Sequence, residues 1–168
     1  MDTQGHILTE FNEALSAVKK NTITIGMLAQ KNIENAFTGL TQRDVSLCNQ
    51  VIADDEEVDQ LEMQIDNDSL QVMAKFRPFA SDLRLVIASM KITHNLERIS
   101  DHAVSIAKRS RKILKGAEID EISFLEPSYK QALLMLKTAL ASYVDNSTGE
   151  AKSVLEMDEK LNKYHRQK

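Results

Sequence analysis

Apolar side chains recur every three or four residues along the first forty positions of the chain. This spacing places them on one face of an α-helix. The face contains Ile7, Phe11, Leu15, Val18, Thr22, Ile25, Ala29, Ile33, Ala36 and Leu40. The pattern therefore predicts one long helix from about Thr3 to Leu40, packed lengthwise on its neighbours.

Two further helices are predicted on either side of Pro78. The second helix begins near Thr41 or Asp44, since either side chain can cap a helix, and it ends by Arg77 because proline disfavours a helical residue before it. Its apolar face contains Leu47, Val51, Val58, Leu61, Ile65, Val72 and Phe76. The third helix begins at once, because proline is tolerated in a first helical turn, and it runs to about Gly116.

The third helix carries two apolar stripes. One contains Leu85, Ile92, Leu96, Ile99, Ala103 and Ile106. The other begins with Leu83, Ile87 and Met90 and continues through His94, Glu97 and Asp101. At 100° per residue, Glu97 lies about 160° from Ile99. Such a helix is expected at the centre of a bundle or beneath a partner.

The rest of the chain predicts a helical hairpin. A fourth helix covers roughly Leu125 to Tyr143, residues 145–149 form a turn, and a fifth helix follows from about Glu150. Short connections predict antiparallel neighbours. Segment 154–162 resembles segment 51–59 in apolar and polar positions, although shared heptads alone would also produce some likeness. We interpret residues 1–116 as a three-helix repeat and residues 117–168 as a partial second repeat of two helices.

Composition and charge exclude several classes of protein. Five glycines and two prolines are too few for a sheet protein, and a net charge of −4 provides no basic footprint for nucleic acid. A single cysteine indicates a reducing compartment. No signal peptide or membrane span is recognisable, so we expect a cytoplasmic protein that reaches a membrane only through partners. Without a phosphate loop, nucleophile elbow or Cys-x-x-Cys pair, it is not expected to be an enzyme.

Acidic side chains on the second and third helices are candidate metal ligands. The second helix carries Asp55, Asp59, Glu62 and Asp66 along one flank, and the third carries Glu97 and Asp101 one turn apart. Asp59 and Glu97 are each about 19 positions from Pro78, so antiparallel helices should place them level. Clustered carboxylates bind hard cations such as magnesium, manganese, calcium or iron.

Two other interpretations of these residues are open. The acidic flank of the second helix is also typical of a solvated surface. Glu97 and Asp101 could instead form an ion-pair network with Arg98, Lys108 or Arg109. The neighbouring His94 and His102 are interpreted as hydrogen-bonded helix residues rather than ligands.

Three segments together resemble the PhoU family of phosphate-uptake regulators. They are AKFRPFASDLR at 74–84, LERISD at 96–101 and the pattern D-x-x-V-D-x-L-E-x-x-I at 55–65. The family's fold is two three-helix bundles related by an internal repeat. The resemblance implies an all-α protein: an antiparallel three-helix bundle of the PhoU type, followed by an incomplete second repeat that forms a helical hairpin.

The resemblance also implies a function. Family members bind metal, in some cases as iron clusters, through acidic motifs that fall here on Asp55, Asp59, Glu97 and Asp101, with Glu62 nearby. Iron, manganese or magnesium is the expected metal. The family represses the phosphate regulon when phosphate is plentiful, and its expected partners are the ATPase of the phosphate ABC transporter and the phosphate-sensor histidine kinase.

Two departures from the family pattern bear on the site and on assembly. Ser100 stands where glycine is usual, and the second acidic motif reads Asp158-x-x-x-Asn162, which makes a second metal site doubtful. We expect a homodimer in which two hairpins cover each other's apolar faces. These faces include Leu133, Leu136, Leu140, Val154 and Leu161.

Two alternative functions are retained. A di-metal carboxylate enzyme or metal-storage protein of the helical-bundle type would bind metal through similar side chains, but such enzymes add Glu-x-x-His ligands. Here Ser100 stands three residues after Glu97. A PhoU-like domain of a sodium–phosphate cotransporter is the other alternative.

Overall fold

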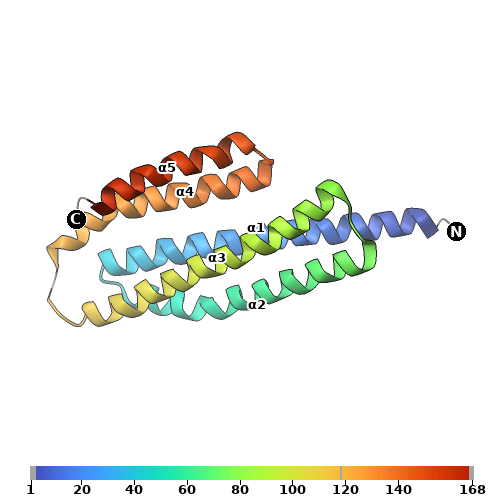
Figure 1. Cartoon of the computed structure of the whole chain (residues 1–168). Helices are drawn as coiled ribbons and strands as arrows, with labels where there is room; N and C mark the ends of the chain where they lie inside the picture. Colours follow the sequence, from blue (N-terminus) through green and yellow to red (C-terminus); the bar gives the residue numbers. More distant parts are fainter. Residues whose placement is uncertain (1–2, 118, 167–168) are drawn as a thin grey trace. The chain divides into compact units, whose positions relative to one another are not determined.

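The chain folds into helices joined by short connections (Figure 1). The computed structural model describes residues 3–117 and 119–166. Its elements are α1 (Thr3–Thr41), α2 (Val45–Phe76), α3 (Ala80–Ile113), the 3₁₀ helix η1 (Asp120–Leu125), α4 (Glu126–Asp145) and α5 (Thr148–Arg166). No strand occurs in the described residues, which confirms the all-helical prediction. None of the described helices combines the length and apolar character needed to cross a membrane.

Asp44 fixes the start of α2. Its Oδ1 atom accepts hydrogen bonds from the backbone N–H groups of Ser46 at 2.8 Å and Leu47 at 3.2 Å. These bonds satisfy two of the donors that a helix N-terminus leaves without partners. Thr41 instead donates its hydroxyl to the carbonyl of Phe37 at 3.0 Å. Of the two predicted caps, Asp44 is therefore the one used.

The described residues form two compact units, and α1, α2 and α3 each contribute a segment to both. The first unit comprises Met1–Ala29 and Asp55–Asp101, and the second comprises Gln30–Asp54 and His102–Lys168. Each unit has its own buried side chains. In the first unit the large apolar ones are Val18, Ile25, Val58, Ile65, Val72, Val86 and Leu96. In the second unit the core includes Ala36, Cys48, Val51, Ala103, Val104 and Ala107.

The buried residues of α1 and α2 agree with the predicted stripes. Val18, Ile25 and Ala29 of α1 are fully buried. Val58 and Ile65 of α2 are fully buried as well. The spacing of apolar residues therefore identified the inward face of both helices.

The two predicted stripes of α3 describe its core only in part. Ile87 and Ile106, one from each stripe, are 40% and 39% exposed. Leu96 and Ala103 of the first stripe are buried. The other buried positions lie outside both stripes and are mostly small: Val86, Ser89, Thr93, Ser100, Val104, Ala107 and Ser110. A pattern read only from apolar residues misses such a seam. Its serines are tolerated because their hydroxyls bond within the helix, as Ser89 Oγ does to the Leu85 carbonyl at 2.8 Å.

The hairpin of α4 and α5 is held mainly by partial burial. No described residue of α4 is fully buried. Within the second unit, Tyr129 of α4 stacks on Phe37 of α1 with ring centroids 3.8 Å apart and planes 6° apart. Lys137 forms an ion pair with Glu34 at 3.0 Å. These contacts attach α4 to the C-terminal part of α1.

Arg43 links the turn between α1 and α2 to the end of α3. Its Nη2 atom donates hydrogen bonds to the carbonyls of Leu114 at 3.0 Å and Gly116 at 2.9 Å. The last carbonyls of a helix have no partner within it. One arginine therefore satisfies carbonyls just beyond α3 and fixes the neighbouring turn.

Gly39 permits the close approach of α1 and α2 beside this turn. A Cβ atom built there would lie 2.8 Å from Cys48 Sγ and 3.1 Å from the Asp44 carbonyl oxygen. Both distances are too short for ordinary van der Waals contact, and Gly39 is buried. The two helices could accept a larger residue only by moving apart.

We predict that Gly39→Ala lowers the free energy of unfolding by about 1–3 kcal/mol, because the added methyl group overpacks this contact. Chemical denaturation followed by circular dichroism measures the change. Gly149→Ala is the control, since the nearest atom to its added Cβ is Ser147 Oγ at 4.0 Å. Equal stabilities of the two variants would contradict the steric argument.

Candidate metal-binding site

Three side chains from α2 and α3 converge in the first unit. Glu62 of α2 and His94 and Glu97 of α3 each offer a ligand atom, and these atoms all lie within 4.8 Å of one another. His94 and Glu97 are three residues apart and therefore share a face of α3. Nδ1 of His94 lies 3.2 Å from Oε1 of Glu62, within hydrogen-bond distance. Together they form a mixed carboxylate and imidazole donor set.

Negative charge accumulates around Glu97. Partial burial raises the pKa of its carboxyl group, and the carboxylates of Asp101, Glu62 and Asp59 raise it further. His94 acts in the opposite direction. Like charges disfavour the ionised form because their repulsion falls when one of them is protonated. A bound cation would offset the same repulsion, so the electrostatics of the cluster suit a metal.

The predicted ligands take different places in this cluster. Glu62 and Glu97 contribute converging atoms, while Asp59 and Asp101 act on the Glu97 carboxyl. Asp55, one turn before Asp59 on α2, is partly buried and lies outside the converging set. The assignment of all five as metal ligands stays a prediction.

His94 is the donor that the sequence interpretation did not select. It forms the predicted kind of hydrogen bond, but the partner is Glu62 on another helix, and this contact brings its ring into the donor set. The usable signal was its position three residues before Glu97, which places both on one flank. The sequence does not reveal which residue of α2 lies opposite.

The alternative of an ion-pair network does not hold for the central carboxylates. Within the described part of the chain, neither Glu97 nor Asp101 forms an ion pair with a lysine or arginine. In the part of the chain that the structure describes, Glu97 and Asp101 therefore have no lysine or arginine at contact distance, and His94 is the basic side chain near Glu97. The exposed His94 side chain, at 65% relative area, leaves the cluster open to solvent.

The donor set favours particular metals. Magnesium and calcium prefer sites made entirely of oxygen ligands, whereas manganese and iron accept imidazole together with carboxylates. Glu62, His94 and Glu97 supply two carboxylates and one imidazole. The residues present thus fit manganese or iron better than magnesium.

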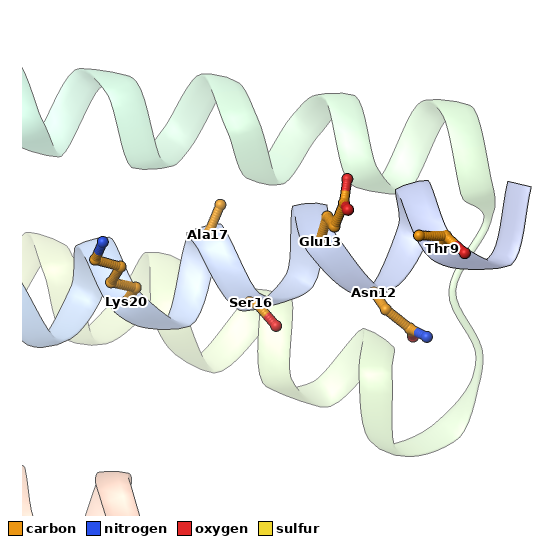
Figure 2. A pocket seen from close by; sticks show the side chains of 6 residues that line it. All are labelled: Thr9, Asn12, Glu13, Ser16, Ala17 and Lys20. Carbon is orange, nitrogen blue, oxygen red and sulfur yellow. The ribbon is translucent and has the colours of Figure 1, made fainter. Parts of the chain in front are cut away.

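Two other depressions described on the first unit lack converging donors. Figure 2 shows one that is lined by Thr9, Asn12, Glu13, Ser16, Ala17 and Lys20. All six belong to α1, and their side chains diverge around that helix. Another lies between α1 and α2 beside the ion pair of Glu10 and Lys75, whose atoms are 2.9 Å apart. Neither presents a set of groups directed at one ligand.

Comparison with known proteins identifies relatives of this chain. A family model described as the PhoU domain matches residues 22–110. A PhoU homologue of the phosphate-specific transport system from Pseudomonas putida is 31% identical over 163 residues, which is 96% of this chain and 63% of that protein. The homologue from Rhizobium meliloti (strain 1021) is 32% identical over 168 residues, covering 95% of this chain and 68% of that protein. The chain thus spans about two thirds of the length of these relatives.

Solved structures show the same fold. The crystal structure of PhoU from Pseudomonas aeruginosa aligns with a TM-score of 0.89 at 28% identity, over 94% of this chain and 76% of that one. The phosphate transport system regulatory protein PhoU from Streptococcus pneumoniae aligns with a TM-score of 0.84 at 26% identity, over 93% and 73%. With the family model, the sequence relatives and the shared fold in agreement, the chain belongs to the PhoU family.

Proposed function

We propose that this protein is an accessory regulator of phosphate transport that works by binding rather than by catalysis. The observation that carries the proposal is the match of nearly the whole chain to relatives named phosphate-specific transport system accessory protein PhoU homolog. The Streptococcus pneumoniae neighbour is described as a regulatory protein of the phosphate transport system. Those names describe the relatives, and the proposal extends them to this chain.

The proposed partners are the ATPase of the phosphate ABC transporter and the phosphate-sensor histidine kinase. In this role the protein represses phosphate-regulon signalling when phosphate is plentiful. It acts in the cytoplasm and reaches the membrane only through these partners. Helical bundles suit such a role because their outer faces can change without disturbing the core.

We propose further that the carboxylate cluster binds manganese or iron. Glu62, His94 and Glu97 supply the converging donors, and the nearby Asp59 and Asp101 add negative charge. Asp55 is the remaining predicted ligand, one turn along α2. A bound cation would hold α2 to α3 by offsetting repulsion between carboxylates on the two helices.

Metal should stabilise the fold, because a ligand that binds only the native state adds to its stability. At 100 times the dissociation constant the gain is about 2.7 kcal/mol. We expect Mn²⁺ to raise the melting temperature of chelator-treated protein, and the double variant Glu62→Gln with Glu97→Gln to lose that rise. Glu57→Gln, an exposed position on α2, is the control. If the melting temperature is the same with EDTA and with Mn²⁺, the cluster does not bind metal and is only a solvated acidic surface.

A di-metal carboxylate enzyme remains the alternative, and His94 is the observation in its favour. Its ring bonds to Glu62 of α2 and lies within 4.8 Å of a carboxylate oxygen of Glu97, a mixed donor set that resembles the ligation of such enzymes. Oxygen consumption by the iron-loaded protein separates the two functions. A regulator binds iron without sustained oxygen uptake. Continuous turnover that Glu97→Gln abolishes would favour the enzyme.

Homodimer formation is proposed through the hairpin. The residues first expected to be open, such as Leu136 and Leu140, are half-buried within the chain. Leu134 of α4 and Leu155 of α5 are instead 50% and 71% exposed. A second hairpin would remove this apolar surface from water.

Sedimentation equilibrium should give twice the 18.9 kDa monomer mass for the native chain. Leu134→Glu with Leu155→Glu should reduce it to the monomer, since charges would be forced into the interface. Met27→Glu, at a position 64% exposed on α1, should remain dimeric. A native monomer at micromolar concentration would contradict the proposal.

The central test of the regulatory function is direct binding to the transporter ATPase. Biolayer interferometry with the purified ATPase should give an affinity of roughly 1 µM or tighter. Preincubation with EDTA and with Mn²⁺ tests whether metal changes that affinity. If neither the ATPase nor the sensor kinase binds under either condition, the proposed function is wrong.

A further inference from the structure

The connection between α2 and α3 displays an aromatic side chain to solvent. Phe79 is 86% exposed, more than any other large apolar side chain in the described residues. Single exposed apolar residues are common on protein surfaces. An almost fully exposed phenylalanine in a turn is less common than a partly exposed one. The residues around it indicate whether it has a role.

Unusual backbone conformations bracket Phe79. Arg77 and Ala80 both have φ of 50°, in the left-handed region that residues with a Cβ rarely adopt. A left-handed residue commonly ends a helix, and Arg77 ends α2 in this way, as Arg43 and Asn146 do after α1 and α4. Ala80 instead begins α3, so its conformation is the one that the surrounding structure must impose. Pro78 also restricts its own φ. Arg77, Pro78 and Ala80 therefore each have a φ angle that is either fixed by the side chain or uncommon for the residue type.

Hydrogen bonds hold this turn on both sides of Phe79. The backbone N–H of Arg77 donates to the Met73 carbonyl of α2 at 3.2 Å. The N–H of Asp82 in α3 donates to the carbonyl of Phe79 itself at 3.2 Å. The backbone of Phe79 is thus fixed while its ring is exposed. A group presented in this way loses little conformational freedom when it binds.

Packing at the end of α2 does not require the Phe79 ring. Phe76, three residues earlier, meets Phe11 of α1 with ring centroids 5.3 Å apart. Lys75 adds an ion pair with Glu10 at 2.9 Å. These contacts join α1 and α2 inside the first unit. The Phe79 side chain takes no part in these contacts, so the ring is not needed to hold α1 and α2 together at this end.

Exposed cationic side chains accompany Phe79. Arg77 lies two residues before it, and Arg84 lies five residues after it on α3. Asp82 is the one carboxylate in segment 77–84. Aromatic residues and arginines together are typical of the central contacts of protein interfaces. A partner surface complementary to them would combine an apolar socket with carboxylates at its rim.

We propose that the turn 77–80 is a docking element that inserts Phe79 into an apolar socket of a protein partner, with carboxylates of that partner facing Arg77 and Arg84. This inference rests on the proposed function, since the partner it names is the transporter ATPase. A lipid surface is the weaker candidate because a single apolar side chain gives little anchoring to a bilayer.

Binding of the purified ATPase to matched variants tests this inference. Phe79→Ser should weaken binding by about tenfold or more, while Phe79→Tyr, which keeps the ring, should bind within about twofold of the native chain. Arg84→Glu should weaken binding and reduce its dependence on salt. Met27→Ser removes another exposed apolar side chain of the first unit and should have no effect. Circular dichroism confirms that each variant is folded.

The outcomes separate this inference from the proposed function. If the native chain binds the ATPase and Phe79→Ser binds equally well, only the docking element is wrong. If the native chain binds neither the ATPase nor the kinase, both proposals fall. Phe79-dependent binding to vesicles of phosphatidylcholine and phosphatidylglycerol, without binding to the ATPase, would overturn the docking element in favour of a lipid surface.

Discussion

Close packing along a seam of small side chains on α3 is the constraint on which the helical core depends. In the first unit Ser89, Thr93 and Ser100 are fully buried, and in the second Ala103 and Ala107 take equivalent places. Small residues let neighbouring helices approach, and dispersion contacts gain strength as the gap closes. Serine and threonine can fill such positions because their hydroxyls can bond to carbonyls of the preceding turn. Ser110 does so with the Ile106 carbonyl at 2.9 Å.

The same packing brings charged side chains to the edge of the core. Glu97 follows the buried Leu96 and precedes the buried Ser100, so it lies beside the seam and becomes partly buried. Glu62 has a similar place between the buried Val58 and Ile65 of α2. Their convergence is therefore a consequence of helix packing. Burial, and then repulsion from the neighbouring carboxylates, raises the pKa of the Glu97 carboxyl, and a bound cation would offset that repulsion.

Much of the fold followed from the sequence because the relevant signals are local. Asp44 and Pro78 fix helix ends through their own geometry, and the spacing of Val18, Ile25 and Ala29 marks the inward face of α1. The seam of α3 was missed because hydrophobicity alone ranks Ser89 and Thr93 below Ile87. Small size decided their burial instead. Ser89 Oγ also bonds to the Leu85 carbonyl within the helix, whereas Thr93 Oγ1 is buried without a hydrogen-bond partner among the described residues.

The candidate site was only partly predictable. The acidic residues could be identified from their spacing and from a family resemblance. The role of His94 depended on which α2 residue lies opposite, and the predicted stripes gave the rotation of α3 only in part, since Leu96 and Ala103 are the members that are buried. Correct alignment required the seam positions, which place Glu97 at the margin of the core and His94 farther into solvent.

The two ends of the three-helix region use different devices to keep the helices aligned. Between α1 and α2, Gly39 removes a side chain so that Cys48 can approach, and Arg43 reaches two carbonyls beyond α3. The backbone of the turn between α1 and α2 is left-handed at Arg43. Between α2 and α3 it is left-handed at two residues, Arg77 and Ala80, and none of the three is glycine. The first device optimises packing and hydrogen bonding. The second is unfavourable for the backbone alone, and glycine at either position would remove the penalty. Arg77 ends α2 in the way that helices commonly end, so the penalty that needs a reason is the one at Ala80. Because Ala80 directly follows the exposed Phe79, we relate its conformation to the way in which the turn presents that ring.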